Sequence, residues 1–299
     1  MVTYYGLMDI GSNTIHAVVY AWDGQKKKKV ASKKEFAGLI QYVEGGILNE
    51  EGAARLCNTV QQLSLLFCSY QCEEVLYFAT AVLRVIENQK EILQQVKKQT
   101  GKEIVVISGQ DEAYYDFISL QNCSKRPCAL GLDLGGGSGQ VFYYTQDGLE
   151  ASSSYPIGCL YLSTQYVSGI LPTLKERSEI QNQVKMQLKN GPDFCCLGID
   201  TLYVMGGTGR ACLLLAENLQ DISVRKVKTC LTIGQLRDLL ELIQESEEVL
   251  MQLLPERLYT IVPGLLAILT VAEYIGVTKV NIVKEGVREG ILLSLVKKA

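Results

Sequence analysis

The fold is indicated by the stretch Leu7-Met-Asp-Ile-Gly-Ser-Asn-Thr-Ile-His-Ala-Val-Val-Tyr20, which returns in similar form as Gly131-Leu-Asp-Leu-Gly-Gly-Gly-Ser-Gly-Gln-Val-Phe-Tyr-Tyr144. The two stretches align without a gap at an offset of 124 residues, so that Asp9 meets Asp133. An offset of this size is about the length of one domain. The repeat predicts two similar domains that each open with the same hairpin; coincidence between two short apolar stretches is the alternative.

A candidate domain boundary lies between the two copies. The segment Asn122-Cys-Ser-Lys-Arg-Pro127 is polar and basic and ends in proline, which is typical of a linker. We therefore predict an N-terminal domain over residues 1–124 and a C-terminal domain over residues 125–299. Each is long enough to bury a core of its own.

Strand and helix patterns alternate along both halves, which predicts an α/β fold. The predicted strands are Tyr4–Met8, Ile15–Trp22, Val75–Phe78, Ile104–Ile107, Thr201–Met205 and Val280–Val283. The predicted helices cover residues 50–70, 88–99, 111–120, 210–217, 236–244, 265–274 and 290–297.

Both glycine loops of the repeat are followed by β-branched and aromatic residues, so each is a strand–turn–strand hairpin. This pattern excludes a dinucleotide-binding fold and a Walker loop, in which a helix follows the glycines. Backbone N–H groups of such turns can bind phosphate, and Asp9 or Asp133 can hold Mg²⁺ beside it. An ordinary tight β-turn, in which Asp, Gly, Ser and Asn are common, is the alternative.

Composition narrows the class of protein further. Apolar residues make up 47% and charged residues 20% of the chain, which is typical of a globular protein. The net charge of −3 supplies no basic field for nucleic acid, although Lys26–Lys29 form a cluster that we interpret as a solvated hairpin tip. No apolar run is long enough to span a membrane, and Asp9 interrupts the N-terminal one, so we expect a cytoplasmic protein without a signal peptide.

With the hairpins in place, the chain resembles the exopolyphosphatase/guanosine pentaphosphate phosphatase (Ppx/GppA) family, in its short two-domain form. The similar motifs occur in family order and cover nearly the whole chain. They are Asp9-Ile-Gly-Ser-Asn13, Ala79-Thr-Ala-Val-Leu-Arg84, Ile107-Ser-Gly-Gln-Asp-Glu-Ala113, Asp133-Leu-Gly-Gly-Gly-Ser138, Gly206-Gly-Thr208 with Arg210, Pro255-Glu-Arg257 to Pro263-Gly264, and Glu285-Gly-Val-Arg-Glu-Gly290.

The resemblance implies two actin-like ATPase domains with the substrate in the cleft between them. It implies a Mg²⁺-dependent hydrolase that releases the terminal phosphate of inorganic polyphosphate or of guanosine pentaphosphate. By motif, Glu112 is the base that activates water, Arg84 binds phosphate, and Asp133 with Asp9 and Glu112 organises the metal and the water. The implied phosphate-binding residues are Gly11, Ser12, Asn13, Gly135, Gly136, Gly137, Ser138, Gly207 and Thr208.

The residues themselves support some of these roles. Ser108 and Asp111 have the spacing of a capping box, so we interpret Asp111 as a cap rather than a catalyst. Glu112 falls on the first helical turn, where the helix dipole favours a carboxylate. The single His16, in a predicted strand, leaves no Ser-His or Cys-His pair for nucleophilic catalysis.

The chain also departs from the family pattern. Tyr161 and Thr164 stand where Arg and Glu are common, and Tyr259 stands where Asp is common. These departures motivate a second hypothesis, a non-catalytic sensor that binds polyphosphate or an alarmone nucleotide. A third is a sugar-kinase-like phosphotransferase with Asp111 or Asp133 as its base, for which no sugar-site motif is found. The sequence leaves the oligomeric state open, a homodimer included.

Overall fold

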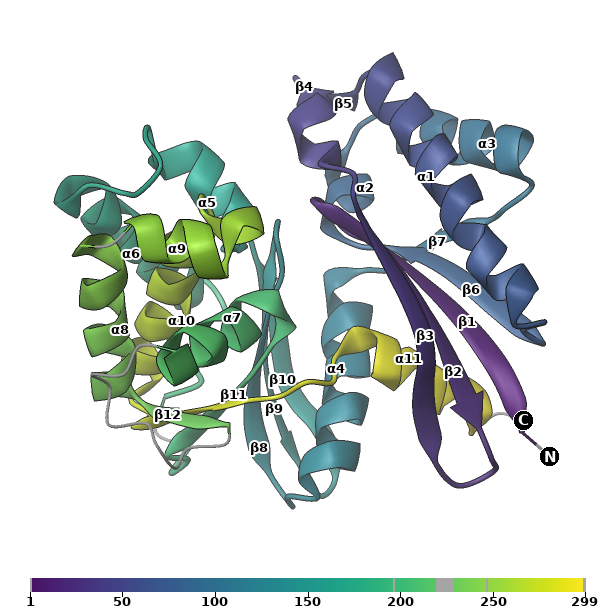
Figure 1. The fold of residues 1–299 in the computed structure, drawn as a ribbon. Coiled ribbons are helices and arrows are strands. Elements are labelled where there is room, and N and C mark those ends of the chain that lie inside the picture. The colour runs from purple at the N-terminus through teal and green to yellow at the C-terminus, as the bar shows by residue number, and fades with distance from the viewer. Residues whose placement is uncertain (1, 196, 219–228, 246, 298–299) are drawn as a thin grey trace. The chain divides into compact units, whose positions relative to one another are not determined.

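The computed structural model describes residues 2–195, 197–218, 229–245 and 247–297. The chain divides into two compact units, Met1–Asp111 and Glu112–Ala299 (Figure 1). This division falls near the beginning of helix α4 (Gly109–Ser124), whereas the boundary predicted after residue 124 falls at its end.

The first unit is built on a five-stranded sheet with the order β3-β2-β1-β6-β7. β1 pairs antiparallel with β2 and parallel with β6, and β3 forms the outer strand beside β2. The strands are β1 (Thr3–Ile10), β2 (Thr14–Trp22), β3 (Lys27–Phe36), β6 (Glu74–Ala79) and β7 (Ile104–Val106), with β4 (Val43–Glu44) and β5 (Ile47–Leu48) as a separate small ribbon.

Helices α1 (Glu50–Ser69) and α3 (Gln89–Thr100) cover one face of this sheet (Figure 1). Their apolar residues, among them Leu56, Val60 and Ile92, form one core with Met8 and Ile10 of β1. The remaining helices are α2 (Ala81–Val85) and the 3-10 turn η1 (Leu39–Tyr42). This layer fixes the ends of β1 and β2, between which the first glycine loop lies.

The second unit has a six-stranded sheet with the order β10-β9-β8-β11-β13-β12. β8 pairs antiparallel with β9 and parallel with β11, and β13 continues the parallel part. The strands are β8 (Ala129–Leu134), β9 (Gly139–Thr145), β10 (Gly148–Tyr155), β11 (Thr201–Met205), β12 (Cys230–Thr232) and β13 (Lys279–Ile282).

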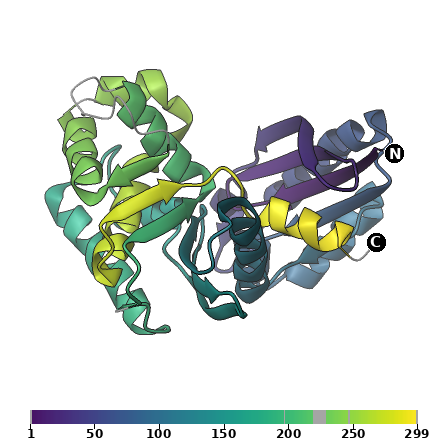
Figure 2. The same cartoon turned by 90° about the horizontal axis from the view of Figure 1, so that it is seen from below.

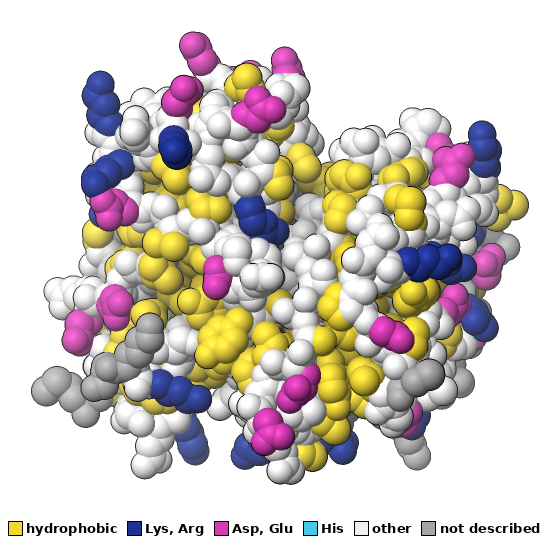
Figure 3. Space-filling view, turned by 180° about the vertical axis from the view of Figure 1, so that it is seen from behind, with side chains coloured by type: hydrophobic (Ala, Val, Ile, Leu, Met, Phe, Trp, Pro, Cys, Tyr) yellow, Lys and Arg dark blue, Asp and Glu magenta, His cyan; other side chains and the backbone are white. Residues whose placement is uncertain are grey.

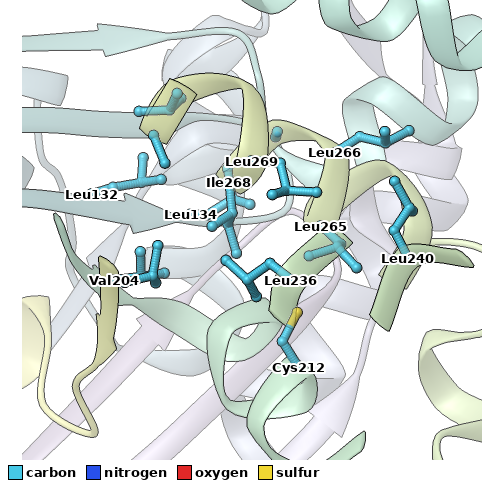
Figure 4. Packing of buried hydrophobic residues seen from close by; sticks show 14 of the residues in the cluster. Leu132, Leu134, Val204, Cys212, Leu236, Leu240, Leu265, Leu266, Ile268 and Leu269 are labelled. Carbon is cyan, nitrogen blue, oxygen red and sulfur yellow. The ribbon is translucent and has the colours of Figure 1, made fainter. Parts of the chain in front are cut away.

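A helical layer built around α10 (Ile261–Ile275) covers one face of this second sheet (Figures 1 and 2). Leu265, Ile268 and Leu269 of α10 contact the same cluster as Leu132 and Val204 of the sheet (Figure 4). The other helices are α5 (Cys159–Tyr166), α6 (Leu174–Lys189), α7 (Gly206–Asn218), α8 (Ile233–Glu245), α9 (Glu247–Leu253), η2 (Pro255–Arg257) and α11 (Val287–Val296).

Helix α4 covers the opposite face of the second sheet. Its residues Ala113, Phe117 and Leu120 pack in one cluster with Phe142 and Tyr144 of β9. A helix held by its core residues in this way has a fixed amino end, and that end carries Glu112.

The two hairpins share one register, which confirms that the repeated stretches fold alike. Asp9 pairs with His16 across β1 and β2, and Asp133 pairs with Gln140 across β8 and β9, again 124 residues apart. Each hairpin is followed by a third antiparallel strand with an irregular register, and each first strand has a parallel neighbour on its other side. The prediction of an α/β fold is correct for both units.

One prediction in this region was wrong. Lys27–Lys29 begin strand β3 and do not lie in a turn, because pairing with Tyr20–Trp22 continues the sheet through them.

Among the described residues, no helix is long and apolar enough to cross a bilayer.

Candidate active site

The first glycine loop joins β1 to β2 through residues 11–13. The N–H of Gly11 donates to the carbonyl of Thr14 at 3.0 Å, and a Cβ on Gly11 would lie only 3.1 Å from that oxygen. The carbonyls of Ser12 and Asn13 accept from the chain that follows β3. The Ser12 side chain is 4% exposed, and its hydroxyl has no hydrogen-bond partner among the described residues.

The second glycine loop repeats this geometry at residues 135–138. The N–H of Gly135 donates to the carbonyl of Ser138 at 2.9 Å, and a Cβ on Gly135 would lie 3.2 Å from that oxygen. The carbonyl of Gly136 accepts from the N–H groups of Leu160 and Tyr161 at 2.9 and 3.0 Å. The loop is therefore anchored to the start of α5.

The motif that carries Arg84 is joined to the first loop by a backbone hydrogen bond. The N–H of Thr80 donates to the carbonyl of Ile10 at 3.2 Å, so the start of α2 adjoins the end of β1. The guanidinium of Arg84 is partly buried and donates from Nη1 to the carbonyl of Ile107 at 3.2 Å.

The turn at Gly206 and Gly207 joins β11 to α7 next to Asp133. Gly206 has φ +92°, and a Cβ on it would lie 2.8 Å from Oδ1 of Asp133. A side chain at Gly207 would collide with the guanidinium of Arg257. Thr208 follows as a buried residue at the first turn of α7. Only glycines at these positions let the turn approach Asp133 and Arg257 so closely.

Asp111 is a helix cap, as its spacing from Ser108 predicts. Oδ2 of Asp111 accepts from the N–H and the hydroxyl of Ser108 at 3.1 and 2.7 Å. The N–H of Asp111 in turn donates to the Ser108 hydroxyl at 3.0 Å. Because these bonds occupy its carboxylate and the side chain is exposed, Asp111 stabilises the start of α4 and is not a candidate catalytic residue.

Glu112, the next residue, points into the protein and is linked to the second loop. Its side chain is 7% exposed, and Oε2 accepts from Nε2 of Gln140 at 3.1 Å. The same nitrogen lies 3.0 Å from the hydroxyl of Ser138 and 2.9 Å from that of Ser154. One buried amide therefore connects the predicted base to the predicted phosphate loop.

Asp116, one turn after Glu112 on α4, is a member of the site that sequence reasoning missed. It is fully buried, and neither carboxyl oxygen has a hydrogen-bond donor among the described residues. Burial raises the pKa of Asp116 well above its usual value, and the charges of Asp133, Glu112 and Glu289 add to this rise. A raised pKa means that the carboxyl keeps its proton to higher pH, and in its protonated form Asp116 can donate to the neighbouring carboxylate of Asp133.

Three arginines surround the same region. Although part of its side chain is exposed, desolvation lowers the pKa of Arg210, and the positive charges of Arg288 and Arg257 lower it further. Asp133 and Glu289 act on this pKa in the opposite direction. Neighbouring guanidinium groups repel each other, so an additional anion would stabilise this arrangement.

The predicted site residues thus form two groups, one in each unit. Within the second unit, Glu112 and Ser138 share Gln140, and Asp133 adjoins Gly206 and Asp116. Within the first unit, the loop 11–13 adjoins the motif that carries Arg84. The predicted proximity of Asp9 to Asp133 stays a prediction. Within the part of the chain that the structure describes, no three His, Cys, Asp or Glu side chains are arranged to hold a metal ion.

Sequence reasoning missed Asp116 and Gln140, and the sequence contains a signal only for the first. Asp116 lies four residues after Glu112 and therefore on the same helix face, which a helical projection shows. Gln140 is a polar residue near the start of a largely apolar and aromatic strand, and its three partners come from different segments. Its role depends on tertiary structure.

Two of the departures from the family pattern, Tyr161 and Thr164, lie in α5, and the third, Tyr259, follows η2. Tyr161 packs against the apolar core from α5, and its carbonyl accepts from the Thr164 hydroxyl at 3.0 Å. Its N–H donates to the carbonyl of Gly136 in the second glycine loop. Tyr259 is 55% exposed, and its carbonyl accepts from the hydroxyl of Ser163.

Comparison with known proteins gives relatives along the whole chain. Exopolyphosphatase 1 of Mycobacterium bovis is 27% identical over 299 residues, which cover 96% of this chain and 87% of that protein. The guanosine-5'-triphosphate,3'-diphosphate pyrophosphatase of Aeromonas salmonicida is 23% identical and is matched over 97% of this chain and 59% of its own length.

Solved structures share the fold. The Ppx/GppA family member of Aquifex aeolicus has a TM-score of 0.82 at 24% identity, covering 100% of this chain and 99% of its own. An exopolyphosphatase from Cytophaga hutchinsonii has a TM-score of 0.85 at 18% identity, covering 99% of each chain. This likeness confirms the predicted α/β fold class, with its two sheets. The model of the Ppx/GppA phosphatase family matches residues 18–299, and the chain belongs to that family.

Proposed function

We propose that this protein hydrolyses phosphoanhydride bonds and releases the terminal phosphate of inorganic polyphosphate or of guanosine pentaphosphate. Family membership and the two named relatives support the reaction class. The observation that carries the proposal is the hydrogen-bonded link from Glu112 through Gln140 to Ser138. It joins a buried carboxylate suited to accept a proton to a glycine loop suited to bind phosphate.

Phosphate binding in this proposal rests on both glycine loops. Backbone N–H groups of residues 136–138 can donate to phosphate oxygens without obstruction from Cβ atoms. The buried Ser12 hydroxyl, which lacks a partner in the described structure, gains an acceptor when phosphate binds. Arg84 supplies a planar guanidinium that matches phosphate geometry. Gly207 and Thr208 begin α7, whose N-terminal dipole favours an anion.

The residues around Asp133 fit a hard cation by their chemistry. Asp133 and Glu112 supply carboxylate oxygens, which Mg²⁺ prefers, and Asp9 would add a third from the first unit. Mg²⁺ usually keeps several waters and takes one or two carboxylates plus phosphate oxygens, so a set of three protein ligands is not required. When bound, the ion would neutralise phosphate charge and polarise the scissile phosphoryl group.

In the proposed reaction, Glu112 removes a proton from a water molecule aligned with the terminal phosphorus. A bond forms between the water oxygen and phosphorus as the bridging anhydride bond breaks. The proton passes to Glu112, the departing chain keeps the bridging oxygen, and inorganic phosphate is released. Helix α4 supports this step because Phe117 and Leu120 fix its position against the sheet.

The test is phosphate release from long-chain polyphosphate and from guanosine pentaphosphate, each with and without Mg²⁺. We expect release from at least one substrate, and strong dependence on the metal. Direct binding of both substrates is measured in parallel, with Asp111→Asn as a variant that keeps the cap and the activity. Binding without release of phosphate from either substrate would replace the proposal with the sensor hypothesis.

A further inference from the structure

Asp116 of α4 is a buried carboxyl to which the proposed reaction gives no role. Its side chain is fully buried, yet neither carboxyl oxygen has a hydrogen-bond partner among the described residues. It also lies outside the motifs through which the chain resembles its family, the nearest of which ends at Ala113. Burial of a carboxyl without partners opposes folding, so the position of Asp116 requires a physical explanation.

The packing of two helices fixes Asp116 in place. Its neighbours Ala113 and Phe117 hold α4 against the second sheet. On another side, α11 packs directly on the backbone of α4, because a Cβ on Gly290 would lie only 1.8 Å from the carbonyl oxygen of Tyr115. Asp116 therefore cannot turn toward solvent without displacing one of these contacts.

One oxygen of Asp116 and one of Asp133 converge on the same space. An atom at the Cβ position of Gly286 would lie 3.7 Å from Oδ1 of Asp116 and 3.9 Å from Oδ2 of Asp133. Apart from the residues adjoining Gly286, no other described atom lies within 4 Å of that position. The second oxygen of Asp133, Oδ1, lies instead near the turn at Gly206. The two carboxyls are also within hydrogen-bonding reach of each other.

The charges around Asp116 are acidic. Asp133, Glu112 and Glu289 each act to raise its pKa. On the molecular face drawn in Figure 3, acidic side chains are instead scattered and mixed with lysines and arginines. A concentration of buried carboxyls is relieved either by a proton on one of them or by a cation that two of them share.

The pair formed by Asp116 and Asp133 fits a hard divalent cation. Mg²⁺ is typically bound by one or two carboxylates and keeps several waters, so two converging oxygens are a sufficient protein contribution. Asp133 is only partly buried, which leaves a side from which a hydrated ion can approach.

We propose that Asp116 is a ligand of the divalent cation that Asp133 holds, so that α4 and β8 bind this cation together, before substrate arrives. This inference rests on the proposed function, whose cation site it extends. Glu112 and Asp116 are one turn apart on α4. The helix that carries the proposed base would therefore also carry a cation ligand, and its rigidity would set the distance between base and cation.

The test measures cation binding by the full-length protein without substrate. Mn²⁺, which accepts the same oxygen ligands as Mg²⁺, is titrated and its free concentration is followed by electron paramagnetic resonance. Asp116→Asn should weaken Mn²⁺ binding about 100-fold, the upper end of the loss found even for outer partners of a metal site. Asp111→Asn removes one exposed charge from the same helix and should bind Mn²⁺ as the wild type does.

Thermal unfolding gives a second readout. Mg²⁺ should raise the Tm of the wild type and of Asp111→Asn, because a ligand that binds the folded state stabilises it. The same concentration of Mg²⁺ should leave the Tm of Asp116→Asn nearly unchanged, although this variant should be the more stable protein without the ion. A carboxyl with a purely structural role would not change the response to Mg²⁺.

Equal Mn²⁺ affinity in Asp116→Asn and the wild type would overturn the proposal and leave a shared proton as the explanation. An equal loss in Asp111→Asn, or a wild type that binds no Mn²⁺, would overturn it as well. Failure of the proposed function is distinguishable. A wild type that binds Mn²⁺ through Asp116 but releases phosphate from neither substrate would retain the cation site and exclude the hydrolase.

Discussion

The two glycine hairpins have the same backbone register but different surroundings. Near the first loop the chain places Arg84 and the lysines of β3, and the buried Ser12 hydroxyl has no hydrogen-bond partner among the described residues. Around the second it places buried carboxyls, and Ser138 is bonded to Gln140. The surroundings of the second hairpin therefore combine buried carboxyls, among them Asp116 without a donor in the described residues, with nearby guanidinium groups, whereas basic side chains lie near the first hairpin.

In the proposed function, this difference corresponds to a division of labour between the two units. A hydrolase needs both a proton acceptor and positive charge for its anionic substrate; buried carboxyls lie beside the second loop, and Arg84 lies in the motif beside the first. On this view the second unit supplies the water-activating group and the first supplies the charge that attracts substrate. Three predictions test the comparison, in decreasing order of expected effect.

The largest effect is expected at Glu112. Glu112→Gln keeps the size and the contact with Gln140 but removes the proton acceptor, so turnover should fall about 10²–10⁴-fold. Substrate binding should stay similar or tighten, since one negative charge leaves an anion site. Steady-state kinetics and direct binding check both points, with Asp111→Asn as the control. An inactive Asp111→Asn beside an active Glu112→Gln would place the base one residue earlier.

The second prediction concerns the effect of the buried Asp116 on the free energy of unfolding. Its raised pKa means that the folded state holds the proton more tightly than the unfolded state does. Its contribution to stability is therefore complete below the ordinary aspartate pKa of about 3.9 and is lost as pH rises. Asp133 and Glu112 face it, together with Glu289 from α11.

Asp116→Asn should accordingly raise the free energy of unfolding at pH 7 by about 1–3 kcal/mol, the range for a buried group without partners. The gain should shrink as pH falls toward about 4. Denaturant unfolding of the variant and wild type over this pH range measures it. If the variant were less stable than wild type at pH 7, the Asp116 carboxyl would have to make favourable interactions that its acidic neighbours do not suggest.

The smallest effects are expected at the two loop serines, and they should differ in sign. Ser12→Ala removes a buried hydroxyl that has no hydrogen-bond partner among the described residues, so the free protein should keep its stability or gain up to about 1 kcal/mol. Ser138→Ala removes an acceptor of Gln140 and should cost about 1 kcal/mol. Thermal unfolding compares them; equal losses at both positions would remove the distinction between the loops.

The hairpins and the alternation of strands and helices were predictable from sequence because they depend on local patterns. The Ser108–Asp111 cap was predictable for the same reason. Strand β3 was not, since its lysines lack the apolar alternation of a strand and its pairing comes from β2. Helix α10 begins at Ile261, earlier than predicted, because Pro263 is compatible with a first helical turn.

The chemistry of the site was less predictable than its backbone. Motifs located Glu112 and Asp133, but the bond from Gln140 and the charges around Asp116 come from segments far apart in sequence. Helix α6 was not predicted, although the sequence contains a signal for it. Thr173 and Glu176 form a capping box whose four-residue signature is present in the sequence.

The turn at Gly206 restricts which amino acids this position can accept. A Cβ there would press on Oδ1 of Asp133, and φ of +92° is itself unfavourable for any other amino acid. A natural variant or a diverged sequence with a different residue at this position must therefore move the aspartate or rebuild the turn. A chain with a different residue here should therefore hold its aspartate in another position, even where the aspartate itself is retained.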